Sequence, residues 1–180
     1  MKLNTKQLVL VSLMTALMCI LGPLSITLPF TSVPISFTNL VVFLAIAILG
    51  YKLGTLSYII YLLLGLAGLP IFSNFTGGAS KLLGPTGGYL IGFIFMGLAF
   101  GIIIHKFGSS IPTYIIGMVL GTIIVYIFGT AWLAYQMGST FVNCLFIGVV
   151  PFILGDVLKI AIITIICPVI NKSLEKANLT

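Results

Sequence analysis

The sequence predicts an all-α integral membrane protein, a bundle of six transmembrane helices. Of its 180 residues, 60% are hydrophobic and only 6% are charged, whereas a soluble globular domain carries about 25% charged residues. The apolar residues also gather in runs that approach the length needed to cross a bilayer. A water-facing surface cannot be assembled from this composition, and no linker or soluble segment is long enough to form a further domain. We therefore expect one membrane domain over residues 1–180.

Six apolar runs are candidate spans, because a bilayer core about 30 Å thick needs roughly 20 apolar residues per helix. They cover about residues 6–22, 36–50, 53–69, 86–105, 112–134 and 146–170. The second and third are short and separated only by Tyr51 and Lys52. The first follows two lysines, as in a secretory signal peptide. Because it lacks a small-x-small cleavage site and further spans follow, we expect a retained first helix.

The lysines predict the orientation in the cell membrane. An even number of spans places both termini on one side. If that side is the cytoplasm, only Lys81 lies outside, Lys159 lies within a span, and the other six lysines lie inside: Lys2, Lys6, Lys52, Lys106, Lys172 and Lys176. The positive-inside rule therefore favours cytoplasmic N- and C-termini. The net charge of +6 does not predict nucleic-acid binding, since the lysines are scattered and form no basic face.

The first and third outside connections are unusual for solvated loops. Residues 22–35 are neutral, apolar and rich in proline, and residues 69–89 are rich in glycine and nearly as apolar as the spans. Non-helical backbone of this kind is tolerated where it packs on protein or lines a cavity. We expect both loops to fold over the helices and enclose something.

Asp156 and Lys159 are charged residues inside the last apolar run. Each costs roughly 2.5–3.5 kcal/mol near a helix centre, and a spacing of three places both on one helix face. One interpretation is a self-neutralising pair that lets the span insert. The other is a polar site facing the bundle interior, in the outer half of the span. There Lys159 would suit an anionic group and Asp156 would suit N–H donors.

The sequence GPTGGY, residues 84–89, begins the fourth run. Glycine, proline and threonine are common where a helix starts and packs closely, and that interpretation stays open. A ligand-binding loop is the alternative, because glycines let a backbone approach a ligand and Tyr89 offers an aromatic face with a hydroxyl. The polar and flexible residues nearby on the same side are Asn74, Gly77, Gly78 and Lys81.

Ser12 and Ala16 give the first run a small-x3-small spacing, which lets another helix approach closely. Packing within the chain and docking of a partner are equally compatible with it. Other chemistry is missing: the sequence has no nucleotide-binding P-loop, no serine–histidine–acid set on one side, and no paired cysteines for a disulfide or metal site.

Three classes of function remain: a small-molecule-binding subunit of a transporter, an intramembrane enzyme using Asp156 or Lys159, and an assembly subunit. The glycine-rich outer loops favour the first. An enzyme would need a second titratable group beside Asp156, and only Lys159 and Lys81 are available. An assembly subunit would not need elaborate loops on the side where the charges lie.

Several motifs resemble the BioY family, the biotin-binding S components of energy-coupling factor (ECF) vitamin transporters. They are LPFTSVPI from Leu28, LPIF from Leu69, Gly77–Gly78, GPTGGYLIGF from Gly84 and PFILGDVLK from Pro151. The resemblance covers nearly the whole chain in order. It implies six helices with cytoplasmic termini, capture of biotin from outside, and association with a membrane coupling protein and a pair of ATPases. It implies transport, not catalysis, with biotin as cargo and no cofactor; another small vitamin is the alternative.

The resemblance also implies roles for single residues. Asp156 would accept the ureido N–H groups of biotin, with Asn74 and the backbone of Gly77 and Gly78 completing that end. Lys159 would meet the carboxylate or another acceptor, and Tyr89 the rings or tail. Many members of the family carry an arginine near the glycine-rich loop, whereas this chain has no arginine and Lys81 would substitute for it. Thr38–Asn39 stands where they often carry Gln-Thr. Ser12 and Ala16 would dock the coupling protein.

Overall fold

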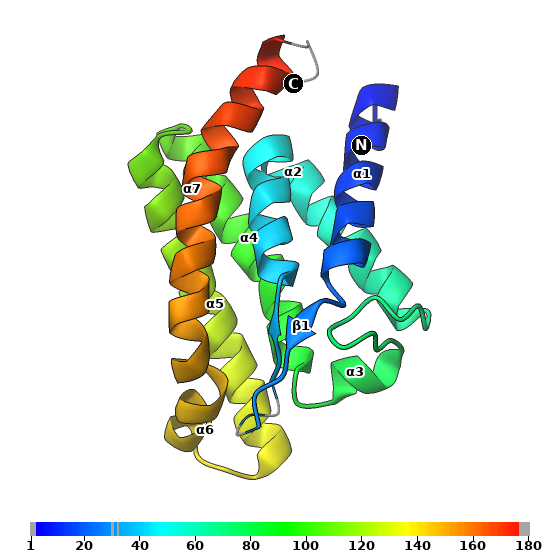
Figure 1. Ribbon diagram of the computed structural model, residues 1–180, viewed down its shortest axis with the longest axis vertical. Coiled ribbons are helices and arrows are strands. Elements are labelled where there is room, and N and C mark those ends of the chain that lie inside the picture. Colours follow the sequence, from blue (N-terminus) through cyan, green and yellow to red (C-terminus); the bar gives the residue numbers. More distant parts are fainter. Residues whose placement is uncertain (1–2, 30, 32, 177–180) are drawn as a thin grey trace.

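The computed structural model describes residues 3–29, 31 and 33–176. It confirms an all-α architecture, a bundle of helices with a small strand pair and loops at one end (Figure 1). The helices are α1 (Thr5–Leu21), α2 (Thr38–Leu66), α3 (Ala79–Leu83), α4 (Gly87–Phe107), α5 (Ile111–Met137), α6 (Phe141–Gly148) and α7 (Ile153–Lys176). A 3-10 turn, η1 (Val150–Phe152), joins α6 to α7, and β1 (Ser25–Ile26) pairs antiparallel with β2 (Ile35–Ser36).

The long helix α2 reverses direction at Gly50. Gly50 has φ 76° and ψ 173°, a left-handed conformation that glycine adopts without steric cost. The two arms fold onto each other, since a Cβ on Gly54 would lie 2.7 Å from the Cα of Ile46. Figure 1 shows the first arm running toward the end of the bundle where the termini lie and the second arm running back toward the loops. These arms coincide with the two short runs that the sequence separates at Tyr51 and Lys52.

Four helical stretches among the described residues are long and apolar enough to cross a membrane: α2, α4, α5 and the run from Phe141 to Leu174. The last differs from the single uninterrupted span expected at residues 146–170. The helix breaks at η1, where Pro151 stands and lacks a backbone N–H for the helical ladder. This break turns Phe152 inward, and the side chain is 6% exposed.

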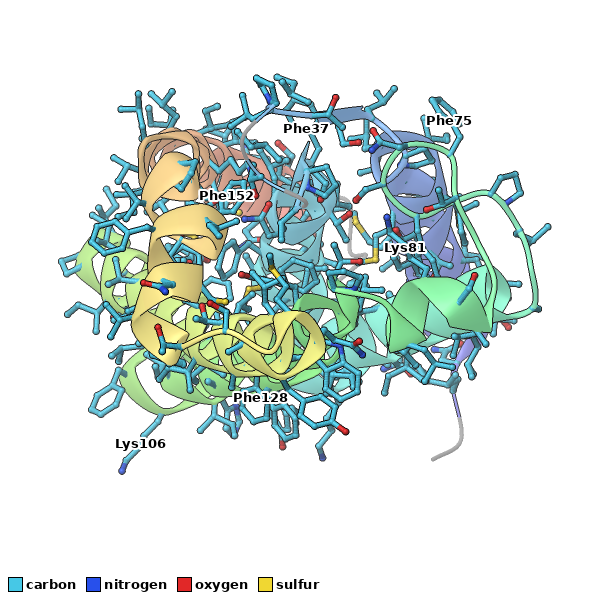
Figure 2. All side chains as sticks on the ribbon, turned by 90° about the horizontal axis from the view of Figure 1, so that it is seen from below. Phe37, Phe75, Lys81, Lys106, Phe128 and Phe152 are labelled. Atoms are coloured by element: carbon cyan, nitrogen blue, oxygen red, sulfur yellow. The ribbon has the colours of Figure 1, made fainter. Side chains whose placement is uncertain are left out.

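Both ends of the described chain lie at the same end of the bundle, opposite β1, α3 and α6 (Figure 1). The cytoplasmic orientation of these ends stays a prediction from the lysines. Viewed from the loop end, large apolar side chains such as Phe37, Phe75 and Phe128 point outward around the bundle (Figure 2). Exposed apolar area on this scale is unusual for a soluble monomer and suits a surface that faces lipid.

Small residues bring α4 and α5 together. An added Cβ on Gly88 would collide with Trp132 on α5, and one on Gly92 would lie 3.2 Å from the Cα of Val125. Such close approach lets helices gain van der Waals contact in a bilayer, where no hydrophobic effect drives them together. It also fixes the start of α4 beneath the loops, which positions the pocket described next.

Candidate substrate-binding site

A pocket that is partly open to the surface lies beneath the loops that join the helices away from the termini. The first outer loop and the end of β2 contribute residues 33–36, and the third outer loop contributes Phe72, Ser73 and Lys81. The expectation that both loops fold over the helices and enclose a space is therefore confirmed. Helices α2, α4, α5 and α7 and the turn η1 supply the remaining walls.

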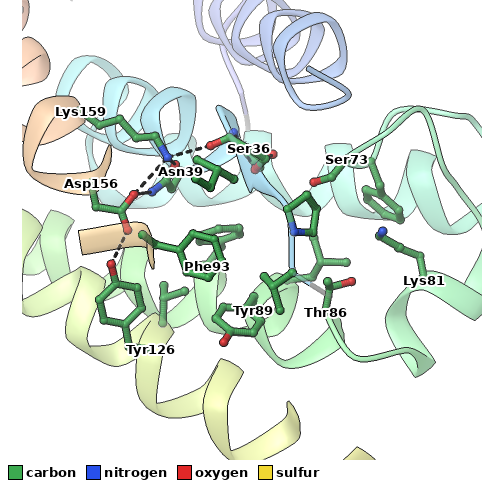
Figure 3. A pocket seen from close by; sticks show the side chains of 18 residues that line it. Ser36, Asn39, Ser73, Lys81, Thr86, Tyr89, Phe93, Tyr126, Asp156 and Lys159 are labelled. Atoms are coloured by element: carbon green, nitrogen blue, oxygen red, sulfur yellow. Dashed lines mark hydrogen bonds and ion pairs between the residues drawn. The ribbon is translucent and has the colours of Figure 1, made fainter. Parts of the chain in front are cut away.

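The charged pair lies at one end of this pocket (Figure 3). The ammonium of Lys159 is 3.1 Å from Oδ1 of Asp156, and both residues are 7% exposed. Lys159 also donates to Oδ1 of Asn39 at 2.9 Å and to the backbone carbonyl of Ser36 at 2.8 Å. The pair therefore faces the interior, and its charges are compensated by hydrogen bonds as well as by each other, which a buried ion pair requires.

Two further side chains hold the carboxylate of Asp156. The amide of Asn39 on α2 donates to Oδ1 at 2.8 Å, and the hydroxyl of Tyr126 on α5 donates to Oδ2 at 2.6 Å. Side chains from three helices thus converge on one acid (Figure 3). The hydrogen bonds to Asp156 fix the orientation of its carboxylate and so the direction of the lone pairs that remain free. A site that accepts N–H groups from a ligand needs such a fixed acceptor.

The opposite end of the pocket carries Lys81, with Ser73 and Thr86 nearby (Figure 3). The ammonium of Lys81 has no hydrogen-bond or ion-pair partner within the part of the chain that the structure describes. Burial lowers the pKa of Lys81 below its ordinary value of 10.5, because desolvation disfavours the charged form. An unpartnered, partly buried cation is ready to accept an anionic group.

Apolar side chains line the pocket between its two ends, among them Tyr89 and Phe93 (Figure 3). The ring of Tyr89 lines it, but its hydroxyl donates to the backbone carbonyl of Gly148 at 2.9 Å. Tyr89 therefore offers a ligand its aromatic face, while its polar atom anchors α4 to the end of α6. The pocket has two polar ends separated by an apolar centre.

Asn74, Gly77 and Gly78 do not line the pocket, although sequence reasoning places them in the site. The side chain of Asn74 accepts a 2.7 Å hydrogen bond from Ser25, which ties the third outer loop to the first. Gly77 is pressed against the backbone of Leu69. Gly78 has φ 87° and donates its N–H to Gly65 at 2.7 Å. These residues shape the loop, and their neighbours Ser73 and Lys81 reach the pocket instead.

Tyr126 is the functional candidate that sequence reasoning missed, whereas Asn39 was noted within the Thr38–Asn39 pair but given no role in the site. The sequence carries a signal for Asn39, because Thr38–Asn39 is a polar pair directly after the first outer loop, where an apolar run begins. Tyr126 carries no such signal, since one tyrosine in an apolar run is typical of a membrane helix. Only the packing of α5 against α7 brings its hydroxyl to Asp156.

Ser12 and Ala16 lie on the exposed face of α1. The opposite face packs inward through Met14 and Met18, and Thr15 donates to the backbone carbonyl of Ser57 at 3.1 Å. The small-x3-small spacing is therefore not used for packing within the described part of the chain.

Comparison with known proteins agrees with this geometry. The sequence model of the BioY family matches residues 1–176. The chain belongs to the BioY family. The biotin transporter BioY of Thermotoga maritima is 37% identical over 161 residues, which cover 89% of this chain and 93% of that protein. The biotin transporter BioY2 of Lactococcus lactis subsp. cremoris is 33% identical over 178 residues, covering 97% and 96%.

A solved structure shares the fold. The crystal structure of the S component for biotin from an ECF-type ABC transporter superposes with a TM-score of 0.87 at 32% identity, covering 95% of each chain. The resemblance to the BioY family is thus confirmed, as are the helical membrane fold and a multi-pass location in the membrane. The named relatives are transporters, so the chain belongs to a family of transport proteins.

Proposed function

We propose that this chain is the S component of an ECF-type transporter and captures biotin from outside the cell. The observation that carries the proposal is the two-ended pocket, with a held carboxylate at one end, an unpartnered lysine at the other and an apolar centre between them. Biotin has the same order of chemistry: a ureido group with two N–H donors, a thioether ring with an alkyl tail, and a terminal carboxylate.

The acid end has unused hydrogen-bonding capacity that matches a cyclic urea. A carboxylate has about four lone-pair sites, and Asp156 uses three, for Lys159, Asn39 and Tyr126. One site on Oδ2 remains for a ligand N–H. The amide of Asn39 donates one of its two N–H bonds to Asp156, so the other is available for the ureido carbonyl. We propose that the ureido group binds here.

The lysine end suits the carboxylate of the ligand. A charge-assisted hydrogen bond from Lys81 would be stronger than a neutral one, and it would also compensate the desolvation of the ammonium. The rings of Tyr89 and Phe93 would contact the thioether ring and the alkyl tail. In this pose Lys81 meets the carboxylate as a point charge, without the bidentate fork that an arginine would offer.

The exposed face of α1 is the surface at which we place the partner proteins. We propose that Ser12 and Ala16, which are exposed on α1, dock a membrane coupling protein and through it a pair of ATPases. Small residues allow the close helix approach that association in lipid needs. The lysine distribution supports a cytoplasmic position for the termini.

Calorimetric titration of biotin into the detergent-purified protein tests the proposal. Binding should weaken strongly in Asp156→Asn and Lys81→Met, while Lys106→Met, at the far end of α4, should bind like the wild type. Wild-type protein that does not bind biotin but binds another vitamin would overturn the biotin assignment. Unchanged binding in Asp156→Asn would mean that the charged pair serves membrane insertion alone.

A further inference from the structure

The tip of the third outer loop holds a phenylalanine in an unfavourable backbone conformation. Phe75 has φ 54°, and Asn74 before it has φ 62°. Glycine and asparagine adopt this left-handed region readily, whereas a bulky side chain there is strained. Phe75 is also 66% exposed, so its ring contributes little burial within the chain. The strain and the exposure together point to a contact that the ring makes outside the chain.

Hydrogen bonds fix the direction of this ring. The buried residue Phe72 exchanges two backbone hydrogen bonds with Thr76 and so closes the turn. The backbone N–H of Asn74 donates to the carbonyl of Pro23 at 3.0 Å. The turn is therefore rooted in the core on one side and joined to the first outer loop on the other. Its tip directs Phe75 outward at the rim of the bundle (Figure 2).

The turn lies just past the end of α1, which is short for a membrane helix. The 17 residues of α1 extend about 25 Å at 1.5 Å per residue, whereas the apolar core of a bilayer is about 30 Å thick. Pro23, which the turn contacts, is two residues past the last residue of α1. Ile20 on the last turn of α1 is 65% exposed, and Leu24 beyond it is 42% exposed. Leu24 and Phe75 thus add apolar surface where the helix is too short.

We propose that Phe75, together with Leu24, anchors the outer loops in the lipid of the membrane, at the boundary between acyl chains and headgroups. Phenylalanine and leucine are among the side chains that insert at this level. Residues 22–29 and 69–80 contain no charged side chain that would oppose insertion. The anchored loop carries Ser73 and Lys81 of the pocket wall, so lipid contact holds that wall in place. The anchor does not depend on which ligand the pocket binds.

Tryptophan fluorescence in lipid nanodiscs tests the location of the ring. Phe75→Trp keeps an aromatic side chain, and the chain has one natural tryptophan, so subtraction of the wild-type signal gives the emission of position 75. We expect this emission to be quenched by phosphatidylcholine with brominated acyl chains and protected from iodide in the water. Quenching by iodide alone would overturn the anchor, because the ring would then lie in water. Protection from both quenchers would also overturn it, since protein, such as a second copy of the chain, would then cover the ring.

Hydrogen exchange in the same nanodiscs tests whether lipid contact holds the turn. Phe75→Asn removes the ring but supplies a residue that favours the left-handed backbone. Relief of strain alone would slow amide exchange over residues 72–76, whereas loss of a lipid anchor would speed it. We expect exchange at least roughly fivefold faster, because burial of a phenylalanine side chain is lost. Phe75→Trp and Phe75→Leu, which keep an apolar side chain, should retain slow exchange.

Phe107→Asn is the matched control, because Phe107 is 67% exposed and ends α4 at the opposite end of the bundle. Exchange over residues 72–76 should be the same in this variant as in the wild type. Unchanged or slower exchange in Phe75→Asn would overturn the anchor. An equal rise in Phe75→Asn and Phe107→Asn would overturn it as well, since it would mean general loosening of the membrane domain.

Discussion

Neutralising the buried pair one charge at a time separates its contribution to stability from its contribution to binding. The side chains of Lys159 and Asp156 are 9% and 10% exposed. Removing one partner of a buried pair typically destabilises a protein by about 3–5 kcal/mol, because the other charge is left uncompensated. In Asp156→Asn the ammonium keeps Ser36 and Asn39 as acceptors. The cost for that variant should therefore lie near the lower figure.

We expect Asp156→Asn and Lys159→Met each to lower the melting temperature in detergent. At about 2–4 °C per kcal/mol for a chain of this size, a loss of about 3 kcal/mol corresponds to roughly 6–12 °C. The double variant removes both charges and should recover most of this loss, since replacing a whole buried pair is often neutral. Binding should not recover. An acceptor contributes about 1.5–3 kcal/mol to a charged hydrogen bond, so biotin affinity should stay roughly 10- to 150-fold weaker.

Thermal melts and biotin titrations of the wild type, the two single variants and the double variant supply both readouts. Single variants as stable as the wild type would contradict the buried, coupled pair that the structure shows. A double variant that binds biotin like the wild type would contradict the use of Asp156 as a ligand acceptor.

Three more predictions concern the rest of the site and the docking face. Tyr89→Phe should lower stability by about 1 kcal/mol, because the hydroxyl of Tyr89 donates to the carbonyl of Gly148. Biotin affinity should change by less than roughly threefold. A large loss of affinity in titration would mean that the hydroxyl contacts the ligand. Biotin affinity should fall as the pH rises through the lowered pKa of Lys81, because the cation is lost. This pH dependence should be absent in Lys81→Met. The same fall in that variant would mean that another group causes the pH dependence. Ser12→Leu or Ala16→Leu should bind biotin normally yet reduce copurification of the coupling protein and uptake; intact copurification and uptake would exclude the docking role.

Local sequence signals identified those parts of the site that depend on a single segment. Asp156 and Lys159 share a helix face because they are three residues apart, and charges inside an apolar run attract notice at once. Lys81 and Tyr89 stood out from their glycine-rich surroundings. All four line the pocket. The apolar character of the outer loops also predicted correctly that they fold over the helices, since backbone polar groups need cover in such a place.

Contacts between distant segments could not be predicted in this way. Tyr126 meets Asp156 only because α5 packs beside α7, 30 residues apart in sequence. The third outer loop shows the same limit. Asn74 looks like a ligand side chain by composition, yet its positive φ of 62° directs it to the first loop, and Ser73 beside it reaches the pocket. Which face of an irregular loop is internal depends on backbone conformation that residue types do not specify.

Helix breaks were only partly predictable. The reversal at Gly50 lies close to the expected boundary, because Tyr51 and Lys52 interrupt the apolar run. The break before α7 was not expected, since Val149 and Phe152 continue the apolar pattern. Pro151 was the available signal, but proline is also tolerated inside membrane helices. The break has a consequence for the site, because it turns Phe152 into the pocket wall.

We propose that the pocket binds biotin with its ureido group at Asp156 and its carboxylate at Lys81. A crystal structure of the protein with biotin is the most direct measurement. We expect a ureido nitrogen within hydrogen-bond distance of Oδ2 of Asp156, the carboxylate beside Lys81, and the bond from Lys159 to Ser36 intact. Biotin in the reverse orientation, with its carboxylate on Lys159, or bound outside the pocket would contradict it.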